Sequence, residues 1–231
     1  MNPPRLWSMA RTSTDTRQAL YLAGLHRFAA EGWQSARVRD IVADAGQAND
    51  SAVNYHFGSR LGLLTEILTR GVMRMEDQRR EDMERWHIRP SGLEESVRAL
   101  IAPLADLLVD AEGRCLLRVI AQVGPLTEVG RTVTAAPVEG TALQAQIEVL
   151  VAEAESRCGR EWARHRVRQL VVMATAELAV RASVEPECSP DGSVGGPGAH
   201  EDYVVDLVHW LAAGLDRPAP GAATDLGRDQ V

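Results

Sequence analysis

The sequence of 231 residues contains no lysine, so all 25 of its permanently cationic side chains are arginine. Only 4% of its residues are aromatic, and alternating β-branched runs are missing, which argues against a β-sheet protein. Its three cysteines are far apart and show no Cys-x-x-Cys spacing, so no disulfide framework is expected. No run approaches the roughly 20 apolar residues that span a bilayer. We therefore expect a cytoplasmic protein without a membrane partner.

The net charge of -7 disfavours, at first sight, an interaction with a phosphate backbone. The charge is uneven along the chain, because residues 1–60 hold seven arginines against five acidic residues. The acidity therefore belongs to the rest of the chain, and a nucleic-acid partner is not excluded. With few cations in this segment, we expect helix N-termini and neutral donors to contribute to DNA affinity, and a modest salt dependence.

Apolar residues recur at helical spacing through most of the chain, which predicts an all-α protein with about nine helices. We expect a loosening of the fourth helix at Gly71 and a kink of the fifth at Pro103. Asn49 or Asp50 is expected to cap the third helix, and Ser59 the fourth. The predicted helices are 14–31, 38–45, 49–56, 60–86, 93–110, 114–123, 138–157, 160–184 and 201–215.

Three segments have the composition of flexible chain. Residues 1–13 are predicted to form an N-terminal arm, and residues 216–231 a disordered tail. Residues 185–198, with four glycines and three prolines, are predicted to form a mobile loop. These breaks leave an N-terminal domain at 14–71 and a second domain at 72–215.

Residues 37–57 have the pattern of a helix-turn-helix, in which two short helices flank a glycine turn. The first helix carries a buried stripe at i, i+3, i+4 and i+7, and Gly46 ends it. In such motifs the first helix braces the second, which lies in the DNA major groove. The stripe consists of Val38, Ile41, Val42 and Ala45.

The local sequence is more specific than this spacing. It reads Phe-Ala-Ala-Glu-Gly-Trp at 28–33, Val-Arg-Asp-Ile-Val followed by Ala-Gly at 38–46, and Val-Asn-Tyr-His-Phe-Gly-Ser-Arg followed by Leu-Leu at 53–64. From Thr16 to Leu64 the chain thereby resembles the TetR family of bacterial transcriptional regulators. The chain departs from the common pattern of this family at two points: the turn before Tyr55 has one additional residue, and Arg60 replaces the usual lysine.

The resemblance implies a three-helix N-terminal DNA-binding domain followed by a helical ligand-binding and dimerisation domain. It also implies a dimeric regulator, a ligand-responsive repressor that binds a palindromic double-stranded DNA operator and is released by a small-molecule effector. The last two helices, at 160–184 and 201–215, would form a four-helix bundle with the partner subunit. Their apolar content supports this interpretation, although an intramolecular core would give the same stripes.

The side chains around the motif suggest how DNA is contacted. Neutral amides such as Asn54 pair bidentately with adenine in the major groove. Arginines beside helix N-termini attract phosphate, and Arg11 or Arg17 is expected to reach an adjacent groove. Asn49 serves equally well as a cap, and Phe57 is expected in the core. The predicted DNA-binding residues are Arg37, Arg39, Gln47, Asn49, Ser51, Asn54, Tyr55, His56, Ser59 and Arg60.

The predicted ligand pocket is less specific, because each candidate is also explained as core. The candidates are large or isolated polar groups within apolar stretches. They are Trp86, Leu104, Leu108, Gln122, Trp162, Met173 and Glu177. Neither a cofactor nor a metal is expected, and the sequence does not name the effector.

Other functions have weaker support. No catalytic motif is present, and Glu161 and His165 at i, i+4 are best explained as a surface pair. A helical interaction protein without DNA activity is one alternative. The other is a metal or redox sensor, for which the irregularly spaced candidates are Cys115, Cys158, Cys188, His200 and His209.

Overall fold

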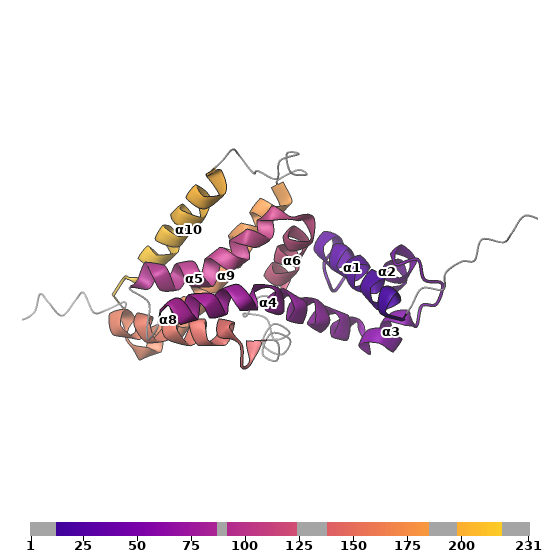
Figure 1. The fold of residues 1–231 in the computed structure, drawn as a ribbon, viewed down its shortest axis with the longest axis horizontal. Helices are drawn as coiled ribbons and strands as arrows, with labels where there is room; N and C mark the ends of the chain where they lie inside the picture. Colours follow the sequence, from indigo (N-terminus) through magenta and orange to yellow (C-terminus); the bar gives the residue numbers. More distant parts are fainter. Residues whose placement is uncertain (1–12, 87–91, 124–137, 185–197, 219–231) are drawn as a thin grey trace, which may run out of the picture. The chain divides into compact units, whose positions relative to one another are not determined.

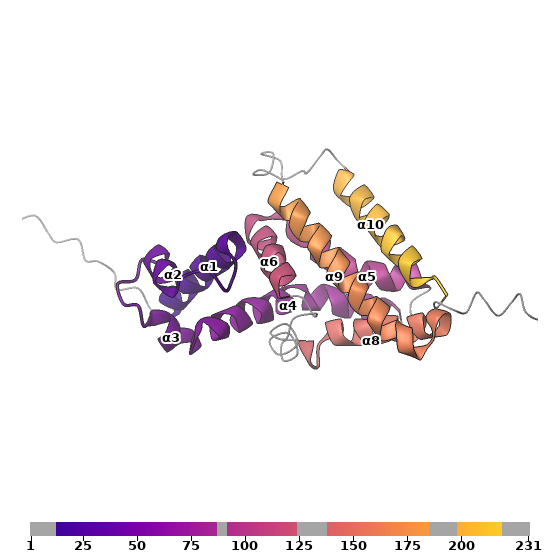
Figure 2. The ribbon, with the colours of Figure 1, turned by 180° about the vertical axis from the view of Figure 1, so that it is seen from behind.

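The computed structural model describes residues 13–86, 92–123, 138–184 and 198–218. All regular structure in these ranges is helical (Figures 1 and 2), which confirms the all-α prediction. The chain divides into two compact units, Met1–Ile67 and Leu68–Val231. The boundary falls inside a helix, about one turn before the boundary at 71/72 expected from the sequence.

The first unit contains α1 (Ser13–Glu31), α2 (Val38–Asp44), α3 (Ala52–Phe57) and the start of α4 (Arg60–Arg85). A Cβ added at Gly24 would lie 2.6 Å from Leu63 Cδ2, so glycine at this position lets α1 and α4 approach closely. The core consists of fully buried apolar side chains from all four helices. They include Leu20, Leu25, Phe28, Ile41, Val53, Leu63, Leu64 and Ile67.

α3 begins later than predicted, at Ala52, with Ser51 at the N-cap position. Asn49 Oδ1 accepts hydrogen bonds from the backbone nitrogen (2.9 Å) and the hydroxyl (2.8 Å) of Ser51. This is the side-chain turn that asparagine favours, and it precedes the helix instead of capping it. The predicted capping by Asn49 or Asp50 is therefore wrong.

The second unit contains the rest of α4, followed by five further α-helices and one 3₁₀ helix among the described residues. These are α5 (Leu93–Ala105), the 3₁₀ helix η1 (Asp106–Val109), α6 (Ala111–Gln122), α8 (Ala142–Cys158), α9 (Arg160–Val184) and α10 (Ala199–Leu215). α9 packs against α6 and α8, and α10 packs against α5 and α9 (Figure 2).

One predicted irregularity and one predicted helix end differ from the structure. α4 runs without interruption through Gly71, whose hydrogen instead allows the Leu116 methyl groups of α6 to approach; a Cβ there would lie 2.9 Å from them. The helix predicted over 93–110 changes to 3₁₀ geometry at Asp106. Pro103 lies inside α5, and because proline has no N–H, the carbonyl of Ala99 loses its helical partner.

The predicted arm, mobile loop and tail lie almost entirely outside the described residues. The first residues of the tail are an exception: Arg157 Nε pairs with Asp216 Oδ1 at 2.8 Å. Arg166 donates to the carbonyls of Arg217 and Pro218. The prediction of disorder is therefore wrong for 216–218. In the part of the chain that is described, no helix is long and apolar enough to cross a membrane.

Candidate nucleic-acid interface

The turn between α2 and α3 spans residues 45–51. Gly46 has a φ of 67°; its N–H bonds the Ala43 carbonyl (2.9 Å), and the Gln47 N–H bonds the Val42 carbonyl (3.0 Å). This pair of hydrogen bonds is a Schellman motif, so Gly46 ends α2 as predicted. The Gln47 side chain is half-buried and donates back to the Ala45 carbonyl at 3.4 Å.

α3 has six residues and is too short to be stable alone. Val53 is its buried side chain and anchors it to the core. Arg17 binds the C-terminal end of α3, because its Nη1 donates to the His56 carbonyl at 2.6 Å. Its Nη2 pairs with Glu66 at 3.0 Å. The same guanidinium lies 4.7 Å from the centroid of the half-buried Phe57 ring. Arg17 therefore clamps α3 in place instead of extending towards an adjacent groove.

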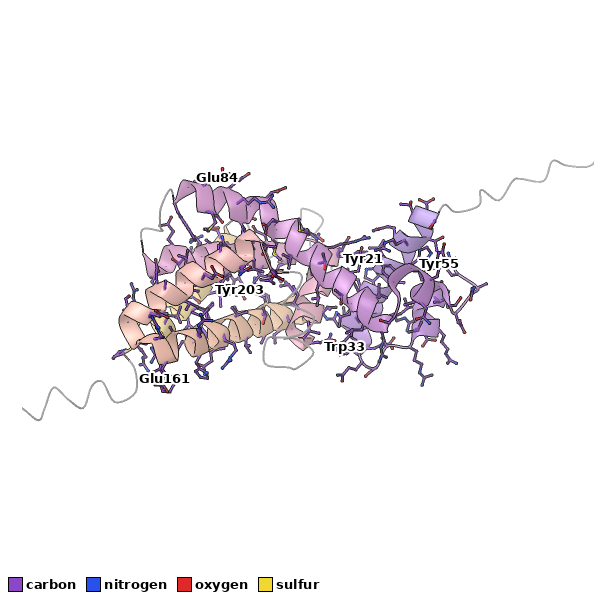
Figure 3. All side chains as sticks on the ribbon, turned by 90° about the horizontal axis from the view of Figure 1, so that it is seen from below. Tyr21, Trp33, Tyr55, Glu84, Glu161 and Tyr203 are labelled. Atoms are coloured by element: carbon purple, nitrogen blue, oxygen red, sulfur yellow. The ribbon has the colours of Figure 1, made fainter. Side chains whose placement is uncertain are left out.

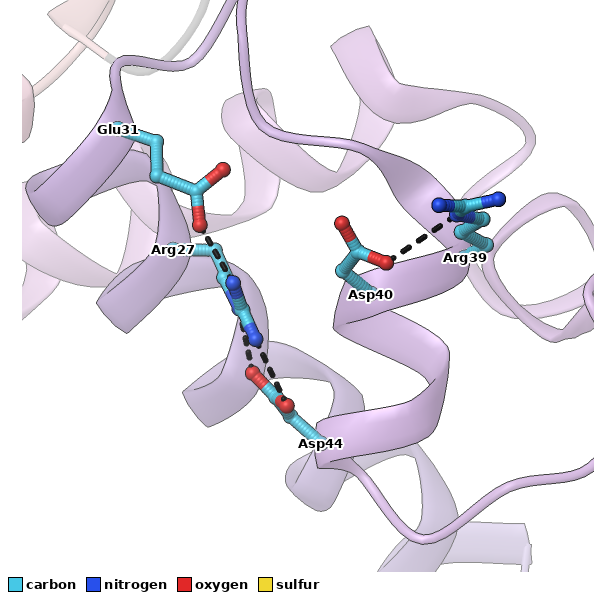
Figure 4. Close-up of polar contacts among 5 residues, drawn as sticks. All are labelled: Arg27, Glu31, Arg39, Asp40 and Asp44. Carbon is cyan, nitrogen blue, oxygen red and sulfur yellow. Dashed lines mark hydrogen bonds and ion pairs between the residues drawn. The ribbon is translucent and has the colours of Figure 1, made fainter.

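A second arginine fixes α2 against α1 (Figure 4). Arg27 binds both oxygens of Asp44, at 2.6 and 3.0 Å, and also contacts Glu31 at 2.5 Å. These hydrogen bonds raise the pKa of Arg27 and lower the pKa of Asp44. The i, i+4 spacing of Arg27 and Glu31 is visible in the sequence, whereas Asp44 becomes a partner only through the fold. Figure 4 also shows the ion pair between Arg39 and Asp40, at 3.3 Å.

The face formed by the start of α2 and by α3 is exposed and polar. Tyr55 is 81% exposed (Figure 3), and Ser51 and Asn54 are exposed beside it. Within the described residues, no hydrogen bond or ion pair engages the side chain of Arg37 or Asn54. These groups are thus available to an external partner, whereas His56 is half-buried and its ring lies against Tyr55.

The start of α4 adds two more predicted contacts. Ser59 caps this helix as predicted, because its Oγ accepts a hydrogen bond from the backbone N–H three residues on (2.9 Å). Arg60 Nη1 donates to the carbonyls of Gln34 (2.8 Å) and Ala36 (3.3 Å), and its guanidinium lies 5.8 Å from the Trp33 ring centroid. Arg60 is therefore already engaged with the turn that precedes α2.

The predicted pocket residues are distributed over several helices of the second unit. Three of them are buried, two are half-buried, and Met173 and Glu177 are exposed on α9. Met173 alone among the seven lines a groove of about 410 Å³ between α9 and α10, within the described ranges. The buried residues are Trp86, Leu104 and Leu108, and the half-buried ones are Gln122 and Trp162.

Sequence inspection missed a buried polar cluster in the second unit. Arg79, Glu76 and Gln146 are at most 1% exposed. Arg79 follows Met75 by one helical turn on the buried face of α4, so a charged residue occupies a core position of the apolar stripe. A charged residue at a core position is visible in the sequence and was the signal that could have revealed this cluster.

The residues considered for other functions are dispersed. Cys115 is half-buried, and burial raises the pKa of its thiol; Cys158 is buried, and Cys188 lies outside the described residues. No group of three potential metal ligands occurs in the described ranges. Glu161 is exposed (Figure 3), while His165 contacts Arg168 instead of forming the predicted pair with Glu161.

These features define a helix-turn-helix protein with a second, purely helical unit in its described part. No family model and no curated protein sequence matches the chain. The fatty acid degradation regulator FadR from Bacillus halodurans matches in structure, with a TM-score of 0.54 and 16% identity over 85% of this chain and 98% of that one. NalD, the secondary repressor of the MexAB-OprM multidrug efflux pump in Pseudomonas aeruginosa, matches with a TM-score of 0.53 and 18% identity. The match covers 88% of this chain and 97% of that chain.

A TetR-family regulator from Streptomyces coelicolor A3 has a TM-score of 0.43 and 18% identity, with 90% of this chain and 99% of that chain covered. The FadR and NalD matches show that the chain shares their fold. The all-α fold expected from the sequence, with a helix-turn-helix near the N-terminus followed by a second helical unit, is confirmed.

Proposed function

We propose that the chain is a dimeric DNA-binding regulator of the TetR type, which represses transcription from a palindromic operator. The observation that carries the proposal is the arrangement of α3, whose Val53 is buried while Asn54 and Tyr55 are exposed. Such a helix can enter the major groove, where the amide of Asn54 pairs with adenine and Tyr55 donates to a phosphate. Arg37 and Arg39, at the start of α2, would neutralise further phosphates.

Exposed apolar side chains on α9 and α10 support the proposed dimer. Met173, Val180 and Val184 follow one another at i, i+7 and i+11, so they share one face of α9, and each is at least 45% exposed. On α10, Val205 and Trp210 are 45% and 56% exposed. Large exposed apolar patches mark interaction sites. A second copy of this chain placed there would give two recognition helices for two half-sites.

The proposed effector is a small molecule with apolar character that binds the second unit. α4 is a continuous helix that begins in the first unit and ends in the second. A ligand that favours one position of α4 would shift the population between forms that match and do not match the spacing of the operator half-sites. Glu177 and the other predicted pocket residues remain candidates for this role.

Fluorescence anisotropy with DNA from the region upstream of the protein's own gene tests the proposal. We expect binding that weakens as salt increases and that exceeds binding to a shuffled sequence of the same length and composition. Light scattering on the same sample should give the mass of two chains. The absence of salt-dependent binding to the upstream DNA would overturn the proposal.

A further inference from the structure

The second unit buries a cation, Arg79, that forms no ion pair with any described residue. Arg79 is 0% exposed, and no carboxylate of the described residues lies within the 4.0 Å ion-pair distance. Within the described ranges its Nη1 donates only to neutral oxygens: the carbonyls of Ala99 (3.3 Å) and Leu100 (3.2 Å) and the side-chain amide oxygen of Gln146 (2.6 Å). Burial lowers the pKa of Arg79 to about 10, so the side chain is still charged at neutral pH.

One edge of this guanidinium is unsatisfied. Among the described residues, Arg79 Nε has no hydrogen-bond partner, and Nη2 contacts only the Met75 sulfur at 3.9 Å. Nε–H and one N–H of Nη2 point the same way in the rigid arginine fork, and together they bind a carboxylate in bidentate fashion. Gln146 Nε2 is a third buried donor, also without a partner among the residues described, and belongs to the amide whose oxygen contacts Arg79.

Glu76 is near this group but does not neutralise it. Its Oε1 accepts hydrogen bonds from the Ala142 backbone nitrogen (2.8 Å) and pairs with Arg80 at 3.3 Å. Its Oε2 is buried and has no hydrogen-bond partner in the part of the chain that the structure describes. Glu76 therefore has its own counter-ion in Arg80, and of the described carboxylates Glu76 and Asp82 act on the charge of Arg79 only from beyond the ion-pair distance. An unpaired buried charge is strongly unfavourable, so a molecule that supplies the anion gains affinity.

We propose that the Nε–Nη2 edge of Arg79 and the amide nitrogen of Gln146 bind the carboxylate of the effector, an apolar molecule that ends in a carboxylate group. This inference rests on the proposed function, in which the second unit binds the effector. The carboxylate would join α4, which carries Arg79, to α8, which carries Gln146. Met75 is flexible enough to make way for it. The helices that carry the cluster and its carbonyl partners also bury apolar side chains, among them Val97, Ile101 and Leu150.

Isothermal titration calorimetry on the full chain without DNA tests this site. The probes are octanoate, dodecanoate and benzoate, each beside its uncharged primary amide. We expect at least one carboxylate to bind about tenfold or more tightly than its amide, because charge-assisted hydrogen bonds are the stronger ones. If no carboxylate is preferred over its amide, the proposal is wrong.

Gln146→Glu is the diagnostic variant, because it places a carboxylate beside Arg79 without changing the size of the side chain. We expect it to raise the Tm and to weaken carboxylate binding about tenfold or more. Gln169→Glu makes the same charge change at an exposed position that lines the groove between α9 and α10. It should leave the affinity within about twofold, because neither Arg79 nor Gln146 lines that groove.

The opposite pattern, with binding lost in Gln169→Glu and retained in Gln146→Glu, would overturn the proposal by placing the carboxylate in the groove. DNA binding is measured separately, so the two proposals fail in different ways. If the chain binds its upstream DNA but no carboxylate, the proposed regulator stands and the proposed carboxylate site is wrong. If the chain prefers carboxylates to their amides but binds no DNA, the carboxylate site stands and the proposed regulator is wrong.

Discussion

Replacing Arg60 by alanine is expected to destabilise the first unit as well as to weaken DNA binding. The side chain bonds two carbonyls, those of Gln34 (2.8 Å) and Ala36 (3.3 Å), and lies 5.8 Å from the Trp33 ring. A hydrogen bond to a charged group is worth about 1.5–3 kcal/mol. Arg60 is only half-buried and its second bond is long, so we expect a loss of about 1–2 kcal/mol for the whole set.

Urea denaturation followed by circular dichroism measures this loss, and Arg39→Ala is the matched control. Arg39 is exposed, and its one ion pair with a described residue is with its neighbour Asp40 at 3.3 Å, so its removal should change stability by less than about 0.5 kcal/mol. Arg60→Lys keeps the charge but lacks the planar fork, so it should lose most of the same stability. If Arg60→Ala is as stable as Arg39→Ala, Arg60 does not hold the turn before α2.

The same three proteins separate structure from phosphate binding. We expect Arg60→Ala to reduce the salt slope of DNA binding by about one, as for the loss of one phosphate contact. Arg60→Lys should keep a slope near that of the unchanged chain. A slope unaffected by Arg60→Ala would show that Arg60 positions the motif without touching DNA.

Three further predictions concern DNA readout, acid stability and assembly. Asn54→Ala should weaken operator binding by about 1–3 kcal/mol and binding to random DNA far less; equal losses in anisotropy would contradict base readout. The hydrogen bonds from Arg27 lower the pKa of Asp44 in the folded chain. The pair therefore stabilises the fold at pH values above the ordinary aspartate pKa of about 3.9, and this stabilisation disappears as the pH falls through the lower folded pKa. Urea melts of Asp44→Asn should therefore differ from those of the unchanged chain at neutral pH and converge in acid; a difference that persists in acid would refute this assignment. Trp210→Ser should lower the dimer fraction in light scattering with little change in monomer stability, since Trp210 is 56% exposed; an unaffected dimer would contradict the assignment of α10 to the interface.

Local patterns predicted much of the fold. Gly46 was recognisable as a helix end because the left-handed conformation there favours glycine, and the structure gives it a φ of 67°. α9 was predicted with its observed limits, Arg160–Val184, since a long apolar repeat is a strong signal. The start of α3 was less predictable, because Asn49 can form either a cap or a turn, and both are short-range hydrogen bonds of similar strength.

Local patterns also predicted part of the candidate interface. Exposed side chains such as Asn54 and Tyr55 follow from their place on a short helix beside Val53. The role of Arg17 did not follow, because its partners His56 and Glu66 are about forty or more residues away and meet it only after folding. Arg60 likewise bonds carbonyls whose positions are set by the turn before α2.

By itself, the sequence determined the helical class of the chain and the location of the helix-turn-helix, since periodicity and turn residues act over a few positions. Tertiary structure decided which arginines are free for a partner and which are used within the fold. Arg37 is exposed, Arg27 is bound to Asp44, and Arg79 is buried among neutral oxygens. A guanidinium has the same chemistry in all three places, and only the long-range packing around it sets its partners and its degree of burial.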